Sequence, residues 1–235
     1  MLTPTGYLHS LALGTLLWTT LGWRGWTVCV LYLGLGQMVT KVGFEEKTQL
    51  GIAEGRGGRR GPENVWGSAA TGVVCAVAAV QAAGAGATTE SLFLGISSTA
   101  WVLGYIASLA TKLADTFASE IGKAYGKTTF LITSLQPVPR GTEGAISLEG
   151  TLASVVGGLS LSLYAYTVVG LIQSWQGVGV ATFAAFVATM IESLIGATLQ
   201  EKKGFEWMSN EVVNFLNTLI GAGIAIGLGV AVLGM

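Results

Sequence analysis

The chain is organised around the polar segment Lys112–Thr151. This segment opens with K-L-A-D-T-F-A-S-E-I-G-K-A-Y-G-K-T-T, turns around Pro137 and Pro139, and closes with R-G-T-E-G-A-I-S-L-E-G-T. It is the one long polar stretch between hydrophobic runs, and it holds the only aspartate of the sequence, Asp115. Acids, bases, hydroxyls and glycines at this density, beside apolar runs, predict a site for phosphate and metal.

We expect the first part of this segment to be helical over Ala114–Tyr125. Residues three and four apart share a helix face. One stripe then carries Lys112, Asp115, Ser119 and Gly122, and the next carries Thr116, Glu120 and Lys123. Carboxylates on such a face suit Mg²⁺, which takes one or two of them together with substrate phosphates. The alternative is a helix beside the membrane whose acids and lysines only pair with one another.

Composition places the chain among membrane proteins. Of its 235 residues 51% are hydrophobic and 11% charged, and the mean hydropathy is +0.63. We therefore predict an all-α, polytopic helix bundle forming a single domain over residues 1–235. The net charge of -1 leaves no basic surface for nucleic acid. Cys29 and Cys75 lie in apolar runs, which argues against a disulfide or zinc site.

Seven apolar runs give about seven transmembrane helices, each near the roughly 20 residues that cross a bilayer. The first residues lack the basic start of a signal or transit peptide, so we expect the first apolar run to stay in the protein rather than be cleaved off. The runs are Tyr7–Trp23, Trp26–Val42, Trp66–Gly84, Ser91–Ala114, Gly150–Ile172, Val178–Leu199 and Val212–Leu233.

Charge distribution predicts the orientation in the membrane. With a cytoplasmic N-terminus, all of the 12 Lys and Arg residues except Arg24 lie on the cytoplasmic side, as the positive-inside rule requires. The same orientation also puts every acid except Glu90 on or near that side. We therefore expect a cytoplasmic site formed by loops 43–67, 115–149 and 200–210, in a plasma or thylakoid membrane.

The loop 43–67 contains G-R-G-G-R-R-G-P-E-N, with Arg56, Arg59 and Arg60 among glycines. Arginine binds phosphate through paired N–H donors, and the glycines let the backbone close on a ligand. The alternative is a flexible loop that serves only membrane orientation. The later run Gly122–Thr128 is one residue short of a phosphate-binding Walker A loop, so a P-loop enzyme is rejected, while Lys123 and Lys127 remain candidate phosphate contacts.

Two short alternating segments, Phe130–Thr133 and Ala145–Leu148, predict a β-hairpin. It would bring back over the Asp115 helix the residues Gly141, Thr142, Glu143, Gly144, Ser147 and Glu149. Gly150 would then open the fifth span, where unpaired N–H groups favour an anion.

The last two runs carry polar residues near their expected cytoplasmic ends. Glu192 lies inside the sixth run, and an ionisable residue at that depth is by default a functional candidate. Asn210, Asn214 and Asn217 form an amide stripe on the seventh. Hydrogen bonding between helices is the alternative explanation for these asparagines.

Several of these motifs together resemble the phytyl-phosphate kinase family of chloroplasts and cyanobacteria, which is related to the phytol and dolichol kinases. They are A-D-T-F-A-S-E-I-G-K-A-Y-G-K, G-T-E-G-A-I-S-L-E-G-T, E-S-L-I-G-A-T-L-Q and N-E-V-V-N-F-L-N-T, together with the arginine loop. The wider polyprenol kinases have a lysine just before the serine of S-x-E-G-T, where this chain has Ile146.

The resemblance implies transfer of the γ-phosphoryl group of CTP to phytyl phosphate, with geranylgeranyl phosphate as a second acceptor, for tocopherol and phylloquinone synthesis. The protein would work in contact with membrane lipid, and the sequence leaves a homodimer open. Phytol or polyprenol kinase and CTP-dependent lipid cytidylyltransferase are the alternative activities. A transporter is the alternative outside catalysis, although the polar residues gather at one face.

We assign roles on this basis. Lys112, Asp115 and Glu120 are the expected catalytic residues, and Mg²⁺ is the expected cofactor, with Asp115, Glu120, Glu149 and Glu192 as its candidate ligands. The expected nucleotide and phosphate contacts are Arg56, Arg59, Arg60, Thr116, Ser119, Lys123, Lys127, Gly141, Thr142, Gly144, Ser147, Glu149, Gly150, Asn210, Asn214 and Asn217.

Overall fold

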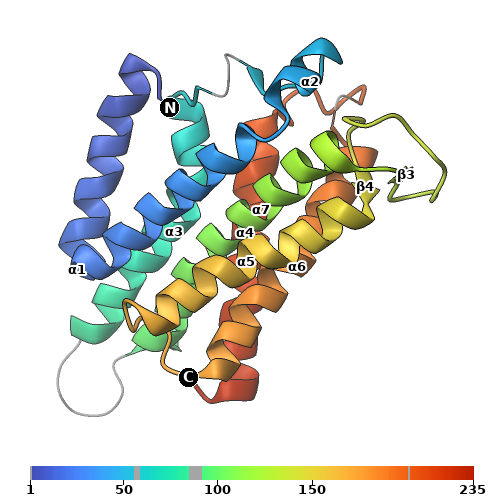
Figure 1. Ribbon diagram of the computed structural model, residues 1–235. Helices are drawn as coiled ribbons and strands as arrows, with labels where there is room; N and C mark the ends of the chain where they lie inside the picture. The colour runs from blue at the N-terminus through green and yellow to red at the C-terminus, as the bar shows by residue number, and fades with distance from the viewer. Residues whose placement is uncertain (1, 56–58, 85–91, 201) are drawn as a thin grey trace.

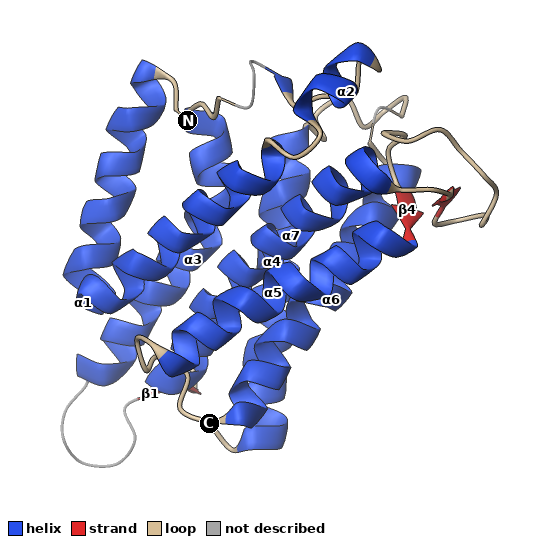
Figure 2. Cartoon of the chain, viewed as in Figure 1, coloured by secondary structure: helices blue, strands red, loops and turns tan. Residues whose placement is uncertain are grey.

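The structure is a computed structural model that describes residues 2–55, 59–84, 92–200 and 202–235. Helices dominate, and Figure 2 shows that strands are confined to short pieces in the connections. The elements are α1 Pro4–Thr40, α2 Phe44–Gln49, α3 Pro62–Gly84, β1 Leu92–Phe93, β2 Ile96–Ser97, α4 Ser98–Tyr125, β3 Thr129–Leu131, β4 Ala145–Ser147, α5 Leu148–Thr167, α6 Trp175–Thr198 and α7 Asn210–Leu233.

Helix α4 is the centre of the bundle (Figure 1). It packs against α1, α3, α5, α6 and α7. Its middle is buried without a break from Leu103 to Thr116, and a helix that is buried on all sides belongs to a core. The expected helix over Ala114–Tyr125 is confirmed as the last part of α4, so the polar stripes of that segment extend directly from the core.

The first two apolar runs form the two helical arms of α1, which meet at a kink. Helix α1 spans 37 residues and is kinked at Gly22, whose φ of 65° lies outside the helical region. Glycine adopts such a φ at no steric cost. At the kink the rings of Trp18 and Trp26 pack edge to face with centroids 5.8 Å apart. The two arms of α1 therefore lie at an angle beside α3 (Figure 1).

The prediction of seven transmembrane helices is wrong in number. Among the described residues, four helices are long and apolar enough to cross a membrane: α3, α5, α6 and α7. Helix α1 is interrupted at Gly22, and the last part of α4 carries charged residues. Large apolar side chains such as Leu8, Leu152 and Val232 are exposed, as on a surface that faces lipid.

Small residues bring α4 and α5 close together. A Cβ atom at Gly157 would lie 3.0 Å from the carbonyl oxygen of Leu113 and 3.0 Å from the ring of Phe117. Small residues at such crossings let helix backbones approach in lipid, where no hydrophobic effect drives helices together. The polar end of α4 is thereby held against the start of α5.

Replacing Gly157 with leucine should therefore destabilise the fold by about 1–3 kcal/mol through overpacking. Gly223→Leu is the matched control, because no atom lies within 4 Å of a Cβ at that helical glycine. The midpoints of denaturation in detergent would be compared. Equal midpoints for the two variants would contradict the close α4–α5 contact.

The predicted hairpin is confirmed, with slightly different bounds. Strands β3 and β4 pair antiparallel, with Thr129 opposite Ser147. Helix α5 begins at Leu148 rather than at Gly150, because Ser147 serves as its N-cap and accepts a hydrogen bond from the Gly150 N–H at 3.1 Å. Strand β4 and α5 are thus joined without an intervening loop.

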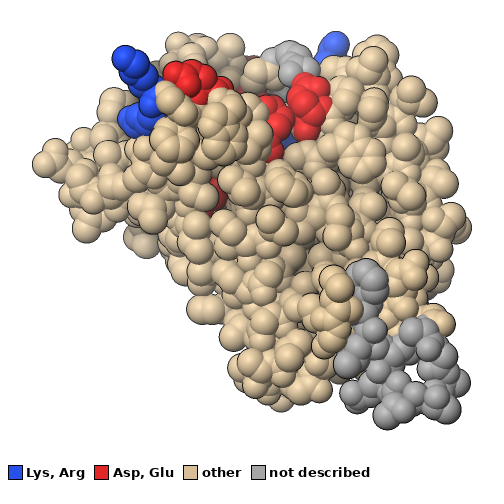
Figure 3. Space-filling model, turned by 180° about the vertical axis from the view of Figure 1, so that it is seen from behind, with Lys and Arg blue, Asp and Glu red and all other residues tan. Residues whose placement is uncertain are grey.

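Charged side chains gather at one end of the bundle. Figure 3 shows acidic and basic side chains at that end of one face, above a tan, uncharged surface. The same end carries α2, the β3–β4 hairpin and the N-terminus (Figure 1). Segments 43–55, 126–149 and 202–209, which are far apart in the sequence, therefore meet at one pole of the molecule.

Candidate functional site

A polar cavity opens at this charged end, with a volume of about 1220 Å³ that includes its open mouth. Its walls come from α4, the start of α5, α6, α7, the hairpin and the segment before α3. The described residues that line it include Arg60, Lys112, Asp115, Thr116, Ser119, Glu120, Lys123, Gly141, Thr142, Glu143, Gly144, Ser147, Gly150, Glu192, Ser193, Asn210 and Asn214.

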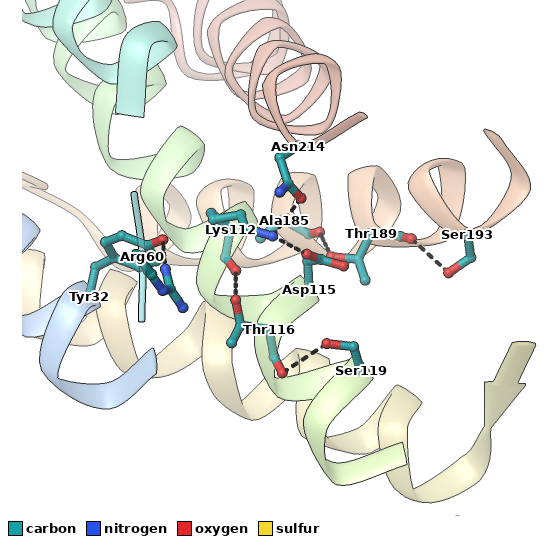
Figure 4. Close-up of polar contacts among 10 residues, drawn as sticks. All are labelled: Tyr32, Arg60, Lys112, Asp115, Thr116, Ser119, Ala185, Thr189, Ser193 and Asn214. Carbon is teal, nitrogen blue, oxygen red and sulfur yellow. Dashed lines mark hydrogen bonds and ion pairs between the residues drawn. The ribbon is translucent and has the colours of Figure 1, made fainter. Parts of the chain in front are cut away.

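Lys112 is the central cation of the cavity. Its Nζ donates to Asp115 Oδ2 at 2.5 Å and to Asn214 Oδ1 at 2.7 Å, which joins α4 to α7 (Figure 4). Lys112 and Asp115 are each only 8% exposed. Buried charges persist only when they are paired and hydrogen-bonded. This cluster therefore holds a fixed charge pair at the floor of the cavity.

Glu192 adds a second carboxyl group to the cluster. It lies on α6 and interacts electrostatically with Asp115, Lys112 and Glu143. Thr189 lies one turn before it and Ser193 directly follows it, and the hydroxyls of both donate to backbone carbonyls of α6 (Figure 4). Two carboxyl groups from different helices therefore meet beside one lysine, an arrangement that attracts a cation.

A second buried ion pair joins Lys47 of α2 to Glu120 of α4. Lys47 is fully buried, and its Nζ also donates to the Thr40 carbonyl at 3.0 Å. No role was predicted for Lys47, since nothing in its local pattern reveals a partner so distant in the chain. Glu120 also lines the cavity, and its expected roles in catalysis and metal binding stay predictions.

The N-terminus of α5 forms another wall. Its unpaired backbone N–H groups and helix dipole favour an anion. A Cβ at Gly150 would lie 2.7 Å from the carbonyl oxygen of Ala118, so glycine is required for α5 to start against α4. Gly144, in the left-handed region with a φ of 73°, packs the hairpin loop equally closely against α6.

Arg60 lies at the opposite edge of the cavity. Its Nη1 donates to the Tyr32 hydroxyl at 2.6 Å, and its guanidinium lies 5.7 Å from the centre of that ring. Contact with Tyr32 raises the pKa of Arg60, against the opposing effect of burial, so the group stays charged. Asn64 and Ser68, which were not predicted as site residues, follow on the first turns of α3 and also line the cavity.

Some residues predicted for the site do not line this cavity. Asn217 is fully buried on α7, and neither amide atom has a hydrogen-bond partner among the described residues. The Glu149 carboxylate accepts from the Lys127 backbone N–H at 3.5 Å, outside the cavity lining. Arg59 is likewise absent from the lining, and Arg56 lies outside the described residues.

The acidic residues of the cavity fit a metal ion that is bound partly by the protein and partly by the substrate. In the described part of the chain, no cluster of three or more His, Cys, Asp or Glu side chains could hold a metal ion by itself. Mg²⁺ does not need such a cluster, because it binds through one or two carboxylates together with substrate phosphates. Asp115 and Glu192 could supply those two carboxylates.

Comparison with known proteins identifies relatives among integral membrane proteins. The family model described as integral membrane protein DUF92 matches residues 1–222. The uncharacterised membrane protein sll0875 of Synechocystis sp. is 55% identical over 228 residues, covering 97% of this chain and 83% of that protein. The uncharacterised membrane protein MJ0933 of Methanocaldococcus jannaschii is 31% identical, over 94% of this chain and 83% of that one. No solved structure matches.

A further relative is a chloroplast protein. The chloroplastic protein VTE6 of Arabidopsis thaliana is 43% identical over 228 residues, which cover 96% of this chain and 64% of the plant protein. These relatives confirm the resemblance to the phytyl-phosphate kinase family of chloroplasts and cyanobacteria that the motifs indicated. The chain belongs to the integral membrane protein family DUF92.

Proposed function

We propose that this protein is a CTP-dependent kinase that transfers the γ-phosphoryl group to phytyl phosphate and makes phytyl diphosphate. The observation that carries the proposal is the buried Lys112–Asp115 pair beside Glu192, in a cavity walled by a helix N-terminus. Phosphoryl transfer requires mainly positioning and neutralisation of charge. Similarity to the chloroplastic protein VTE6 supports this activity, while the choice of CTP rests on the motif resemblance.

The chemistry of the cavity suits a phosphate acceptor better than an alcohol. A phosphate monoester has a second pKa of about 6 and is largely ionised at neutral pH, so it needs no general base. The only histidine of the sequence, His9, accepts a hydrogen bond from Trp66 at 2.9 Å and does not line the cavity. The carboxylates are therefore left for binding charge rather than for removing a proton.

In the proposed step an oxygen of the acceptor phosphate attacks the γ-phosphorus of the nucleotide. A new P–O bond forms, the bond from that phosphorus to the β–γ bridging oxygen breaks, and CDP leaves. Lys112 and the N–H groups at the start of α5 would hold phosphate oxygens. Mg²⁺ held by Asp115 and Glu192 would supply neutralisation of the triphosphate charge.

We also propose that the cavity faces the cytoplasmic side. The N-terminus lies at the cavity end of the bundle, where the Thr3 N–H donates to the Arg60 carbonyl at 3.0 Å. The charged residues of the same end satisfy the positive-inside rule only in this orientation.

Labelled nucleotides test the proposed reaction. Purified protein would receive α-labelled or γ-labelled CTP, with phytyl phosphate, geranylgeranyl phosphate or phytol as acceptor. A kinase would transfer label from γ-labelled CTP only, and the label would appear in the prenyl diphosphate. Transfer of the α-label with release of pyrophosphate would identify a cytidylyltransferase, and phosphorylation of phytol alone would identify an alcohol kinase.

The two serine N-caps of α5 and α6 provide a test of the anion-binding wall. Ser147 caps α5 inside the cavity, whereas Ser174 caps α6 outside it, and each accepts a hydrogen bond from the N–H three residues on at 3.1 Å. Replacing either serine by alanine should cost about 1 kcal/mol of stability. Only Ser147→Ala should also lower the rate of transfer. Equal activity losses in the two variants would contradict a role for the α5 N-terminus.

A further inference from the structure

A second, apolar groove lies between the two arms of α1 and the first turns of α3. Leu13 and Gly14 come from the first arm, Trp26 and Val30 from the second, and Val65 from α3. One end of the groove is polar, because Arg60, Asn64 and Ser68 line it there. The groove is therefore amphiphilic along its length, with its charge at one end.

The same three polar residues also line the polar cavity. The groove and the cavity thus meet at Arg60. This residue is fixed at the junction by its side-chain bond to Tyr32 and by the bond from the Thr3 N–H to its carbonyl. A guanidinium carries five N–H donors, which is more than its bond to Tyr32 uses.

We propose that the groove binds the prenyl chain of the acceptor and that Arg60 binds the acceptor phosphate. This inference rests on the proposed function, because it identifies the acceptor subsite of that reaction. An acceptor with one apolar chain and one phosphate matches a groove with one charged end. Because the groove is continuous with the cavity, an acceptor bound in it would place its phosphate next to the nucleotide, as phosphoryl transfer requires.

The groove holds only the part of the chain nearest the phosphate. Tyr32 and Trp26, at its two ends, are six residues apart on the second arm, a distance of about 9 Å by helical rise. This is shorter than an extended phytyl chain, so the remainder lies in the surrounding lipid. At the far end, a Cβ at Gly14 would lie 3.1 Å from Trp26 Nε1, so a larger residue there would fill the groove.

Binding measurements without nucleotide test this assignment. Equilibrium dissociation constants for phytyl phosphate and for phytol would be measured with purified protein in nanodiscs. Gly14→Leu should weaken the binding of both ligands by about tenfold or more, because the leucine side chain obstructs the space for the prenyl chain. Arg60→Gln should weaken phytyl phosphate by a similar factor and leave phytol nearly unchanged, because only the phosphate loses a charge-assisted bond.

Gly34→Leu is the matched control, since it lies on the same helix and no atom lies within 4 Å of a Cβ there. Val30→Trp fills the groove from a partly exposed position and repeats the test if Gly14→Leu does not fold. Groove-filling variants that bind phytyl phosphate as tightly as Gly34→Leu would overturn the proposal. So would equally tight competition by phosphatidic acid, which would make this a phospholipid site.

The binding and transfer experiments together distinguish a failure of the groove assignment from a failure of the proposed kinase activity. If the wild-type protein binds phytyl phosphate in this pattern but transfers no phosphoryl group, the acceptor groove stands and the kinase activity falls. If it transfers the phosphoryl group while groove-filling variants bind normally, the kinase stands and the groove assignment falls.

Discussion

Replacing Asp115 with asparagine is expected to lower kcat for phosphoryl transfer by about 10²–10³-fold, the effect of removing one preorganised electrostatic contact in other active sites. Asparagine keeps the size of the side chain and an oxygen that can accept from Lys112, but it removes the negative charge. Lys112 also retains its bond to Asn214. The variant should therefore fold and lose activity, which steady-state kinetics and size-exclusion chromatography in detergent would measure.

The control for this variant is Glu206→Gln. Glu206 is an exposed carboxylate in the α6–α7 connection that accepts a local bond from the Gly204 N–H at 2.9 Å. Its neutralisation changes the net charge by the same amount without touching the cavity. If the two variants had similar kcat values, the proposed catalytic role of Asp115 would be contradicted.

Replacing Lys47 with methionine is expected to destabilise the protein by about 3–5 kcal/mol, the usual cost of leaving one member of a buried ion pair without its partner. Glu120 is only 3% exposed, so its carboxylate cannot turn to water without local rearrangement. The midpoint of denaturation in mixed micelles would measure the loss. Lys203→Met, at an exposed position, controls for the removal of one positive charge.

A double variant separates a structural pair from a catalytic one. Lys47→Met combined with Glu120→Leu replaces both charges by apolar groups, which commonly restores the stability that the single change removes. If the pair is structural, this variant should recover most of its stability and retain substantial activity. Recovery of stability with activity still abolished would instead support the predicted catalytic role of Glu120.

The parts of the fold that local pattern determines could be predicted. The helix over Ala114–Tyr125 and the hairpin that returns at Ala145 follow from spacing, β-branched residues and turn residues, and both are present. The number of spans could not be predicted by counting apolar runs. Apolar length does not reveal the kink that interrupts α1 at Gly22, nor the charged end of the protein-enclosed α4.

The site could be predicted less completely, because its pairings are made across the fold. Lys112 and Asp115 are three residues apart, so one helix face brings them together and the sequence reveals the pair. Lys47 meets Glu120 from 73 positions away, and only the path of the chain after α1 sets that contact. Asn217 shares a stripe with Asn214, yet its burial at the helix interface separates it from the cavity.

The most direct test of the central claim is a stoichiometric transfer assay. Purified wild-type protein would be incubated with Mg²⁺, γ-labelled CTP and phytyl phosphate, and labelled phytyl diphosphate and CDP would be quantified together. The kinase predicts one CDP for each labelled diphosphate, with neither formed by Asp115→Asn beyond its residual rate. CTP bound by the wild-type protein without label in the diphosphate would contradict the account.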